Sequence, residues 1–211
     1  MSNRKDQPLS LPLSFNEAYI ANPLMATIKF ARFKFAARMI SARDDVLDLG
    51  CGHGHAAWFY ANVTEGKVVG VDLYTDFTSL ADFPQRDNLS FYNENLLDPS
   101  EALLARRFDV VTCIDVIEHF PADEGIGIIE RSSTLLRPGG MLVLGTPNRY
   151  SEPWRSATSR SVHEHEYIPE ELRSIVDEYF ARTLCFSMND EVVHTGGQQM
   201  SWFFYIIAFK A

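Results

Sequence analysis

Apolar residues recur along the chain with two periods, and segments of the two kinds alternate from about residue 45 onward. Period-two segments, which are typical of strands, lie at 45–49, 67–72, 89–93, 109–114, 141–146, 183–188 and 200–209. Segments with helical spacing lie between them, near 54–63, 75–82, 100–106, 122–136 and 169–179. Strands that alternate with helices predict parallel pairing through right-handed crossovers. The pattern therefore predicts an α/β fold, with a doubly wound, mostly parallel sheet and helices on both of its faces.

The first forty residues do not follow this alternation. Residues 1–14 contain two prolines and no period, which predicts a tail. Residues 15–40 have helical spacing, and Pro23 should divide a short helix from a longer one. We therefore divide the chain into a tail with lid helices at 1–40 and one larger domain at 41–211.

Composition narrows the class of protein. With 211 residues, 46% of them hydrophobic, the chain can bury one compact core. Its three cysteines are scattered and odd in number, which argues against a disulfide framework and a structural zinc knot. Its net charge of −9 disfavours nucleic acid as the main partner. Its apolar runs are too short to span a bilayer, so we expect a soluble, cytoplasmic protein with no membrane partner.

The segment VLDLGCGHGH, at 46–55, predicts a ligand site where the first strand ends. Gly50, Gly52 and Gly54 allow positive φ and let a ligand lie against bare backbone at the start of a helix. A dinucleotide fingerprint needs its third glycine at position 55, which is His55 here. Asp72, at the end of the next strand, can accept hydrogen bonds from both hydroxyls of a ribose. The two features together indicate a nucleoside without a pyrophosphate.

Four motifs in sequence order, VLDLGCGHG, VVGVD, FDVVTCIDVIEHF and LLRPGGMLVLGTPNR, resemble those of the class I S-adenosylmethionine-dependent methyltransferases. The resemblance covers about residues 40–190 and implies a Rossmann-like, seven-stranded sheet whose last strand is antiparallel. It implies S-adenosyl-L-methionine as the cofactor, with the three glycines beside its methionine part. The remaining cofactor contacts that it implies are Asp48 at the amino group, Asp72 at the ribose, and also Leu73 and Asp115.

The adenine contact should follow the third strand, where the family often carries an acidic or amide residue. This chain has the sequence NEN at 93–95 in place of the commoner Gly-Asp. We assign the contact to Asn95 with Leu96, and Glu94 is the alternative.

Chemistry is expected at DVIEH, which follows the fourth strand. A helical turn there would put Asp115, Glu118 and His119 on one face. His119 is our candidate for the general base that an acceptor hydroxyl needs, oriented by Glu118 or Asp115. Alternatively, these polar side chains only hydrogen-bond to loop backbone and shape the site.

A metal site is a second alternative, although our primary interpretation assigns no metal. Asp115, Glu118 and His119, joined by His163 or His165, would supply mixed oxygen and nitrogen ligands to a divalent ion. This is similar to the ExxEH…H arrangement of small-RNA 2'-O-methyltransferases and, in part, to the ExxEH of ubiquinone-pathway O-methyltransferases. Asp115 stands where those families have the first glutamate.

The acceptor should be bound by the N-terminal lid and by the loop after the fifth strand. The candidate contacts are Tyr19, Asn148, Arg149, His163 and His165. The basic run of Lys29, Arg32, Lys34 and Arg38 either attracts a phosphorylated acceptor or forms a solvated helix face.

The expected activity is methyl transfer to an oxygen or nitrogen of a small polar metabolite, such as a sugar or nucleotide-sugar. The alternatives are metal-assisted 2'-O-methylation of RNA and a catalytically silent member that only binds the cofactor. The oligomeric state is left open.

Overall fold

The computed structural model describes residues 19–75, 77 and 86–211, so the helix expected at 75–82 lies largely outside the described residues. The strands, in chain order, are β1 (Val46–Leu49), β2 (Val68–Asp72), β3 (Leu89–Asn93), β4 (Phe108–Ile114), β5 (Leu136–Pro147), β6 (Arg182–Asn189), β7 (Val192–His194) and β8 (Phe203–Phe209). The α-helices include α2 (Pro23–Ala37), α3 (His55–Ala61), α4 (Glu101–Leu104), α5 (Ala122–Leu135), α6 (Ala157–Val162) and α7 (Pro169–Val176). Short 3₁₀ helices lie at η2 (Ile117–His119), η3 (Arg149–Trp154) and η4 (Gln198–Met200).

The strands form one sheet in the order β3-β2-β1-β4-β5-β8-β6-β7. β1 to β5 pair in parallel, and β8 inserts antiparallel between β5 and β6. The predicted mostly parallel α/β sheet with an antiparallel last strand is confirmed, but the expected number of seven strands is wrong. The eighth strand is the short β7, which pairs with β6 as a hairpin at the sheet edge and is too short to show a hydrophobic period.

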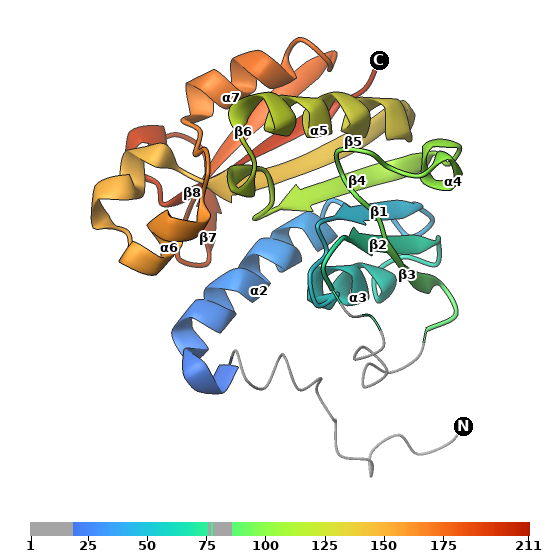
Figure 1. Cartoon of the computed structure of the whole chain (residues 1–211), viewed down its shortest axis with the longest axis horizontal. Helices are drawn as coiled ribbons and strands as arrows, with labels where there is room; N and C mark the ends of the chain where they lie inside the picture. Colours follow the sequence, from blue (N-terminus) through green and yellow to red (C-terminus); the bar gives the residue numbers. More distant parts are fainter. Residues whose placement is uncertain (1–18, 76, 78–85) are drawn as a thin grey trace.

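Both faces of the sheet are covered, with α5 and α7 on one side and α2 and α3 on the other (Figure 1). Successive residues of a strand point to opposite faces, so neighbours enter different cores. Leu47 and Val111 belong to the core under α5 and α7, whereas Val46 and Val110 belong to the core under α2 and α3. These strands are therefore apolar throughout, as parallel strands covered on both faces are.

The helix α2 is built as the sequence indicates and is fixed to the sheet. Pro23 is its first residue, and the Asn22 side chain accepts a hydrogen bond from the Met25 N–H at 3.1 Å. The hydroxyl of Tyr205 in β8 donates to the Arg32 carbonyl at 3.2 Å. The part of the lid that the structure describes thus lies against the sheet beside α3.

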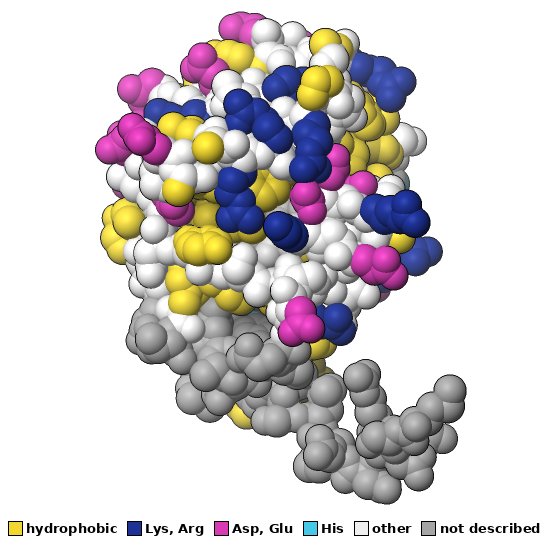
Figure 2. All heavy atoms as spheres, turned by 90° about the vertical axis from the view of Figure 1, so that its right-hand side faces the viewer, with side chains coloured by type: hydrophobic (Ala, Val, Ile, Leu, Met, Phe, Trp, Pro, Cys, Tyr) yellow, Lys and Arg dark blue, Asp and Glu magenta, His cyan; other side chains and the backbone are white. Residues whose placement is uncertain are grey.

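Figure 2 shows the face on the right-hand side of Figure 1, and basic and acidic side chains are intermixed on it. The ion pairs of Arg137 with Asp45 and Asp109 lie at the amino ends of β1, β4 and β5, away from the carboxyl ends where ligands bind in such sheets. All three cysteines are free, as expected. Among the described residues, every helix is too short or too polar to cross a bilayer.

Candidate active site

The glycine turn has the conformation that its sequence predicts. Gly50, Gly52 and Gly54 have φ values of +64°, +49° and +76°, which few side chains tolerate. A Cβ on Gly50 would lie 2.6 Å from the Val116 side chain, whereas a Cβ on Gly52 would meet no atom within 4 Å. Gly50 is therefore required by packing, while the space beside Gly52 is open to a ligand.

Two cavities lie along the carboxyl edge of the sheet and meet at this turn. The larger, about 560 Å³, is lined on one side by Lys29, Phe30 and Phe33 of α2 and on the other by Asp48 and the glycine turn. The smaller, about 330 Å³, is lined by residues of the β2, β3 and β4 ends, among them Asp72, Asn95 and His119. Gly50 and Asp115 line both cavities, so the two form a continuous crevice with room for an elongated ligand.

Asp48 places a buried carboxylate at the floor of the larger cavity. One oxygen accepts a hydrogen bond from the Thr112 hydroxyl at 2.6 Å, and the other has no protein partner. Burial raises the pKa of this carboxyl group to about 7, and the nearby Asp72 charge acts in the same direction. An unpartnered buried oxygen favours a cationic ligand group, which fits the ammonium group of the expected cofactor.

Asp72 ties the glycine turn to the loop after β2. One carboxylate oxygen accepts from the Gly52 N–H at 3.1 Å, and the other accepts from the Tyr74 N–H at 2.9 Å and the Thr75 N–H at 3.1 Å. Asp72 and Leu73 both line the smaller cavity, where the ribose is expected.

At the end of β3, the side chains of Glu94 and Asn95 have different surroundings. Glu94 accepts from the N–H and hydroxyl of Ser100, the residue that caps α4, so its carboxylate is engaged away from the crevice. Asn95 and Leu96 line the smaller cavity. The geometry thus favours Asn95 over Glu94 as the adenine contact.

Asp115 does not share a helical face with Glu118 and His119, and that expectation is wrong. Its φ of +56° turns the chain sharply at the end of β4, and only 117–119 form a 3₁₀ turn. Its carboxylate instead accepts two hydrogen bonds from Arg32 of α2, at 2.6 and 2.7 Å. Arg32 also lies 4.0 Å above the Phe203 ring, so this member of the basic run is neither solvated nor free for an acceptor.

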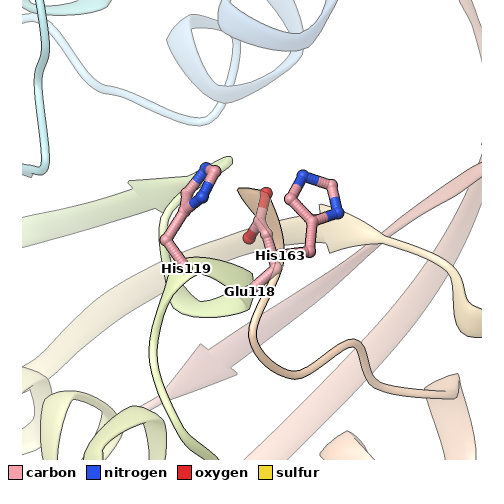
Figure 3. Close-up of side chains that lie close together, drawn as sticks. All are labelled: Glu118, His119 and His163. Carbon is pink, nitrogen blue, oxygen red and sulfur yellow. The ribbon is translucent and has the colours of Figure 1, made fainter. Parts of the chain in front are cut away.

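Glu118, His119 and His163 form a cluster next to the crevice, and Figure 3 shows the Glu118 carboxylate between the two imidazole rings. One ligand-capable atom from each residue lies within 4.8 Å of the others. Backbone hydrogen bonds from Glu164 and His165 to the Glu118 carbonyl, at 2.8 and 3.2 Å, bring the two segments together.

Within this cluster, Glu118 is almost completely buried. One carboxylate oxygen accepts from the Thr146 hydroxyl at 2.9 Å, and the other has no protein partner. Burial, and then the charge of Asp115, raise the pKa of Glu118 to about 8.

The partners of the two histidines determine which ring nitrogen carries the proton. His119 Nδ1 lies 2.8 Å from the Val162 carbonyl, and His163 Nδ1 lies 2.5 Å from a Glu166 carboxylate oxygen. Because a carbonyl only accepts, Nδ1 of His119 is the donor. His163 Nδ1 is 3.4 Å from the Arg155 guanidinium, which only donates, but its much shorter contact is to the Glu166 carboxylate, so it too is assigned as a donor. Each ring, when neutral, then keeps a lone pair on Nε2. The cluster therefore offers two imidazole lone pairs and one carboxylate oxygen for a proton or a metal ion.

The structure separates the candidate acceptor contacts. Asn148 is completely buried, and its amide is used by Gln198, Ser201 and Tyr150, so its assignment as an acceptor contact is wrong. Its hydrogen bonds join the carboxyl end of β5 to the segment that precedes β8.

The other candidates lie outside the cluster. Arg149 pairs with Glu171 at 2.8 Å, and His165 packs on Tyr167, with ring centroids 4.6 Å apart. Tyr19 is half exposed at the beginning of the described chain. Among the predicted acceptor contacts, only His163 brings its side chain into the cluster with Glu118 and His119.

Sequence reasoning missed Arg155 and Glu166 beside this cluster, and it missed the role of Arg32. Arg32 reaches Asp115 across the crevice, and Arg155 pairs with Glu166, which in turn holds His163. No local pattern marks these pairs, although RYSEPWR combines charges with Pro153 in a segment that cannot form a regular α-helix.

Comparison with known proteins connects this geometry to a family. A family model described as "Methyltransferase domain" matches residues 19–182. A "Ubiquinone biosynthesis O-methyltransferase" of Psychrobacter cryohalolentis is 34% identical over 69% of this chain and 62% of its own length. Another of that name, from Paraburkholderia phytofirmans, is 36% identical over 49% of this chain and 44% of its own length. The chain thus spans about half to two thirds of these curated relatives.

Solved structures show the same fold at low identity. The methyltransferase domain of bacterial CtHen1-C superposes with a TM-score of 0.69 at 18% identity, covering 87% of this chain and all of that one. An O-methyltransferase family protein of Burkholderia thailandensis gives 0.63 at 18% identity, covering 99% of this chain and 65% of that one. These similarities support the fold.

Proposed function

Because this chain belongs to the methyltransferase domain family, whose class I enzymes use S-adenosylmethionine as the methyl donor, we propose that it methylates a hydroxyl oxygen of a small polar molecule. The observation that carries this proposal is the cluster of Glu118, His119 and His163 at the edge of the crevice. A hydroxyl acceptor must lose a proton during transfer, whereas an amine needs only to be neutral. A cluster of lone pairs beside the donor site is therefore what oxygen methylation requires.

The crevice fits the donor. Asp48 leaves a buried oxygen unpaired where an ammonium group is expected, Gly52 leaves open space, and Asp72 and Asn95 line the nucleoside side. When bound, S-adenosylmethionine supplies a methyl group already activated by its positive sulfur. What remains for the protein is to align the acceptor and to take its proton.

We assign His119 as the general base that takes the proton of the acceptor hydroxyl. It lines the smaller cavity, and its Nδ1–H is held by the Val162 carbonyl, which leaves Nε2 able to accept the acceptor proton. Glu118 lies beside it, held by Thr146, and its unpaired oxygen can receive a hydrogen bond from the acceptor, or from the Nε2–H of His119 once that ring has taken the acceptor proton.

The names of the curated relatives also support oxygen over nitrogen, since they are O-methyltransferases. Those names refer to ubiquinone biosynthesis, and a sugar or nucleotide-sugar acceptor for this chain stays a prediction. The panel of acceptors in a test must therefore include hydroxylated aromatic rings as well as sugars.

A divalent ion in the cluster is a second candidate, which the grouping of three ligand-capable atoms favours. Glu118, His119 and His163 would hold the ion through one oxygen and two imidazole nitrogens, a set that suits zinc, manganese or iron. A bound ion would lower the pKa of a coordinated acceptor hydroxyl. Asp115 would not contribute, because Arg32 occupies its carboxylate.

The test is turnover of the donor in the presence of an acceptor panel, for the wild type and for His119→Ala. We expect His119→Ala to lower turnover by roughly 10²–10⁴-fold, while donor affinity by calorimetry changes by less than a few fold. The matched control is His194→Ala in β7, the edge strand that β5, β8 and β6 separate from β4, and it should retain full turnover.

The other outcomes separate the alternatives. Loss of turnover with chelator and its return with added metal would select the metal candidate. Donor binding with no turnover of any acceptor would indicate a silent family member. RNA binding with a steep salt dependence would indicate an RNA acceptor instead of a small molecule.

A further inference from the structure

His163 lies in a segment that has no regular structure of its own, yet its ring is held in one position. α6 ends at Val162, and the backbone of the next residues bonds to the Glu118 carbonyl. The His163 ring packs edge-on to the His119 ring, with centroids 5.1 Å apart. Its Nδ1 lies 2.5 Å from a Glu166 carboxylate oxygen, three residues further along the chain, and 3.4 Å from the Arg155 guanidinium.

Glu166 is itself a buried anion with a buried cationic partner. The side chains of Glu166, Arg155 and His163 are 8%, 7% and 10% exposed. Arg155 pairs with the same Glu166 oxygen that His163 uses. An unpaired carboxylate at this depth would be unfavourable, and the Arg155 guanidinium is the cation that pairs with it beside His163.

Arg155 is in turn tied to the rigid end of the sheet. Its guanidinium donates to the Asn148 carbonyl at 2.6 Å and to the Ser151 hydroxyl at 2.9 Å. Asn148 is completely buried and bonds to Ser201, next to the start of β8. The chain of contacts from His163 through Glu166 and Arg155 therefore ends on a part of the core that cannot easily move.

We propose that Glu166, held by Arg155, is a positioning residue that keeps the proton of His163 on Nδ1 and turns its Nε2 lone pair toward Glu118 and His119. The inference rests on the proposed function, in which this cluster handles the acceptor hydroxyl. Glu166 acts through His163 and does not touch the acceptor itself. The partner of His119 is the neutral Val162 carbonyl, so of the two histidines only His163 is held by a charged group.

Nitrogen-15 NMR of the histidine rings tests the proposal directly. In the wild type we expect His163 to carry its proton on Nδ1. The ring signals of His163 are assigned as those that disappear from the spectrum of His163→Gln. This measurement needs no variant at Glu166, so it stands even if such a variant folds poorly. A proton on Nε2 of His163, or a mixture of the two tautomers, would overturn the proposal.

Calorimetric titration with Zn²⁺ alone gives the second readout. Glu166→Gln should weaken Zn²⁺ binding by about 10–100-fold, the range for loss of a partner that orients a ligand, and should leave donor affinity unchanged. Glu164→Gln is the matched control, because it removes the same charge from an exposed side chain two residues away. Equal Zn²⁺ binding by Glu166→Gln and Glu164→Gln, with an unchanged His163 tautomer, would refute the role of Glu166.

The failures of the two proposals differ. In one case the wild type binds no Zn²⁺, its His163 has the expected tautomer, and Glu166→Gln loses that tautomer. The positioning role of Glu166 then stands and the metal candidate fails. If Zn²⁺ binds and chelator stops turnover while Glu166→Gln changes neither, then the metal candidate stands and the positioning role fails.

Discussion

Two buried carboxylates in the site each keep one oxygen without a protein partner. Asp48 lies at the floor of the larger cavity, and Glu118 lies in the cluster with the histidines. Buried polar atoms are almost always paired in folded proteins, so the unpaired Asp48 oxygen at the floor of the larger cavity favours a ligand group that completes it. The pKa of each is raised mainly by burial, to about 7 for Asp48 and about 8 for Glu118.

The raised pKa of Asp48 predicts how donor binding depends on pH. Below about pH 7 the free carboxyl group is protonated, so it carries no charge for the donor ammonium group. We therefore expect donor affinity to rise as pH increases from 5.5 toward 7.5, by up to about tenfold per pH unit at the acidic end. Calorimetry of donor binding across this range measures the slope.

Asp48→Asn is the control for this prediction, since it keeps the shape of the side chain and removes the titrating group. It should bind the donor more weakly and with little dependence on pH. An equal slope in the wild type and in Asp48→Asn would assign the pH dependence to another group.

Among the structural elements, the glycine turn makes the most specific prediction. Gly52 and Gly139 both have positive φ, +49° and +75°, and at both a Cβ would meet no atom within 4 Å. Alanine at either position should therefore cost about 1–2 kcal/mol of unfolding free energy through backbone strain alone. Only Gly52 faces the crevice, so Gly52→Ala should also weaken donor binding by tenfold or more.

Urea unfolding and donor calorimetry on the two variants separate strain from ligand contact. Gly139→Ala should lose stability and keep donor affinity. Equal donor affinity in both variants would mean that the open space beside Gly52 is not part of the donor site.

The elements themselves could largely be predicted from the sequence. The strands β1, β2 and β3 agree with the predicted ranges to within one residue, because apolar runs bounded by Gly, Asp and Asn mark them clearly. β5 begins at Leu136, five residues before the predicted start, because RPGG continues the pairing with β4 through an irregular register. The helix α6 was not predicted, since SATSRSV has too few apolar residues to show a helical period.

The site was predicted only as far as neighbouring residues determine it. The roles of the glycine turn and the grouping of Glu118 with His119 follow from local sequence. His163 was one of the two histidines that the family resemblance offered as a further member of the cluster. The loss of Asp115 from the cluster could not be predicted, because it depends on the left-handed backbone at Asp115 and on an ion pair with a residue 83 positions away. Buried ion pairs between distant segments leave no period in the sequence.

For the molecule as a whole, that ion pair connects the N-terminal helix to the sheet across the crevice. Arg32 of α2 binds Asp115 at the end of β4, and both side chains are largely buried, at 14% and 25% exposure. The same helix supplies Lys29, Phe30 and Phe33 to the larger cavity. The position of α2, and with it one wall of the larger cavity, therefore depends on a contact between the first and the middle parts of the chain.

This dependence predicts a combined loss of stability and donor binding in Arg32→Ala. The variant leaves Asp115 buried without its cation, which should lower the free energy of unfolding by about 1–3 kcal/mol. Because α2 then packs less tightly over the crevice, donor affinity should fall at least fivefold. Lys34→Ala is the matched control, since it removes a positive charge from an exposed position of the same helix.

Adding Asp115→Asn to Arg32→Ala should restore part of the stability, because the unpaired charge is gone, but not the donor affinity, because α2 still lacks its anchor. Urea unfolding and calorimetry on the wild type, the two single variants and the double variant measure both effects. If Arg32→Ala binds the donor as tightly as Lys34→Ala does, α2 is held over the crevice without Arg32.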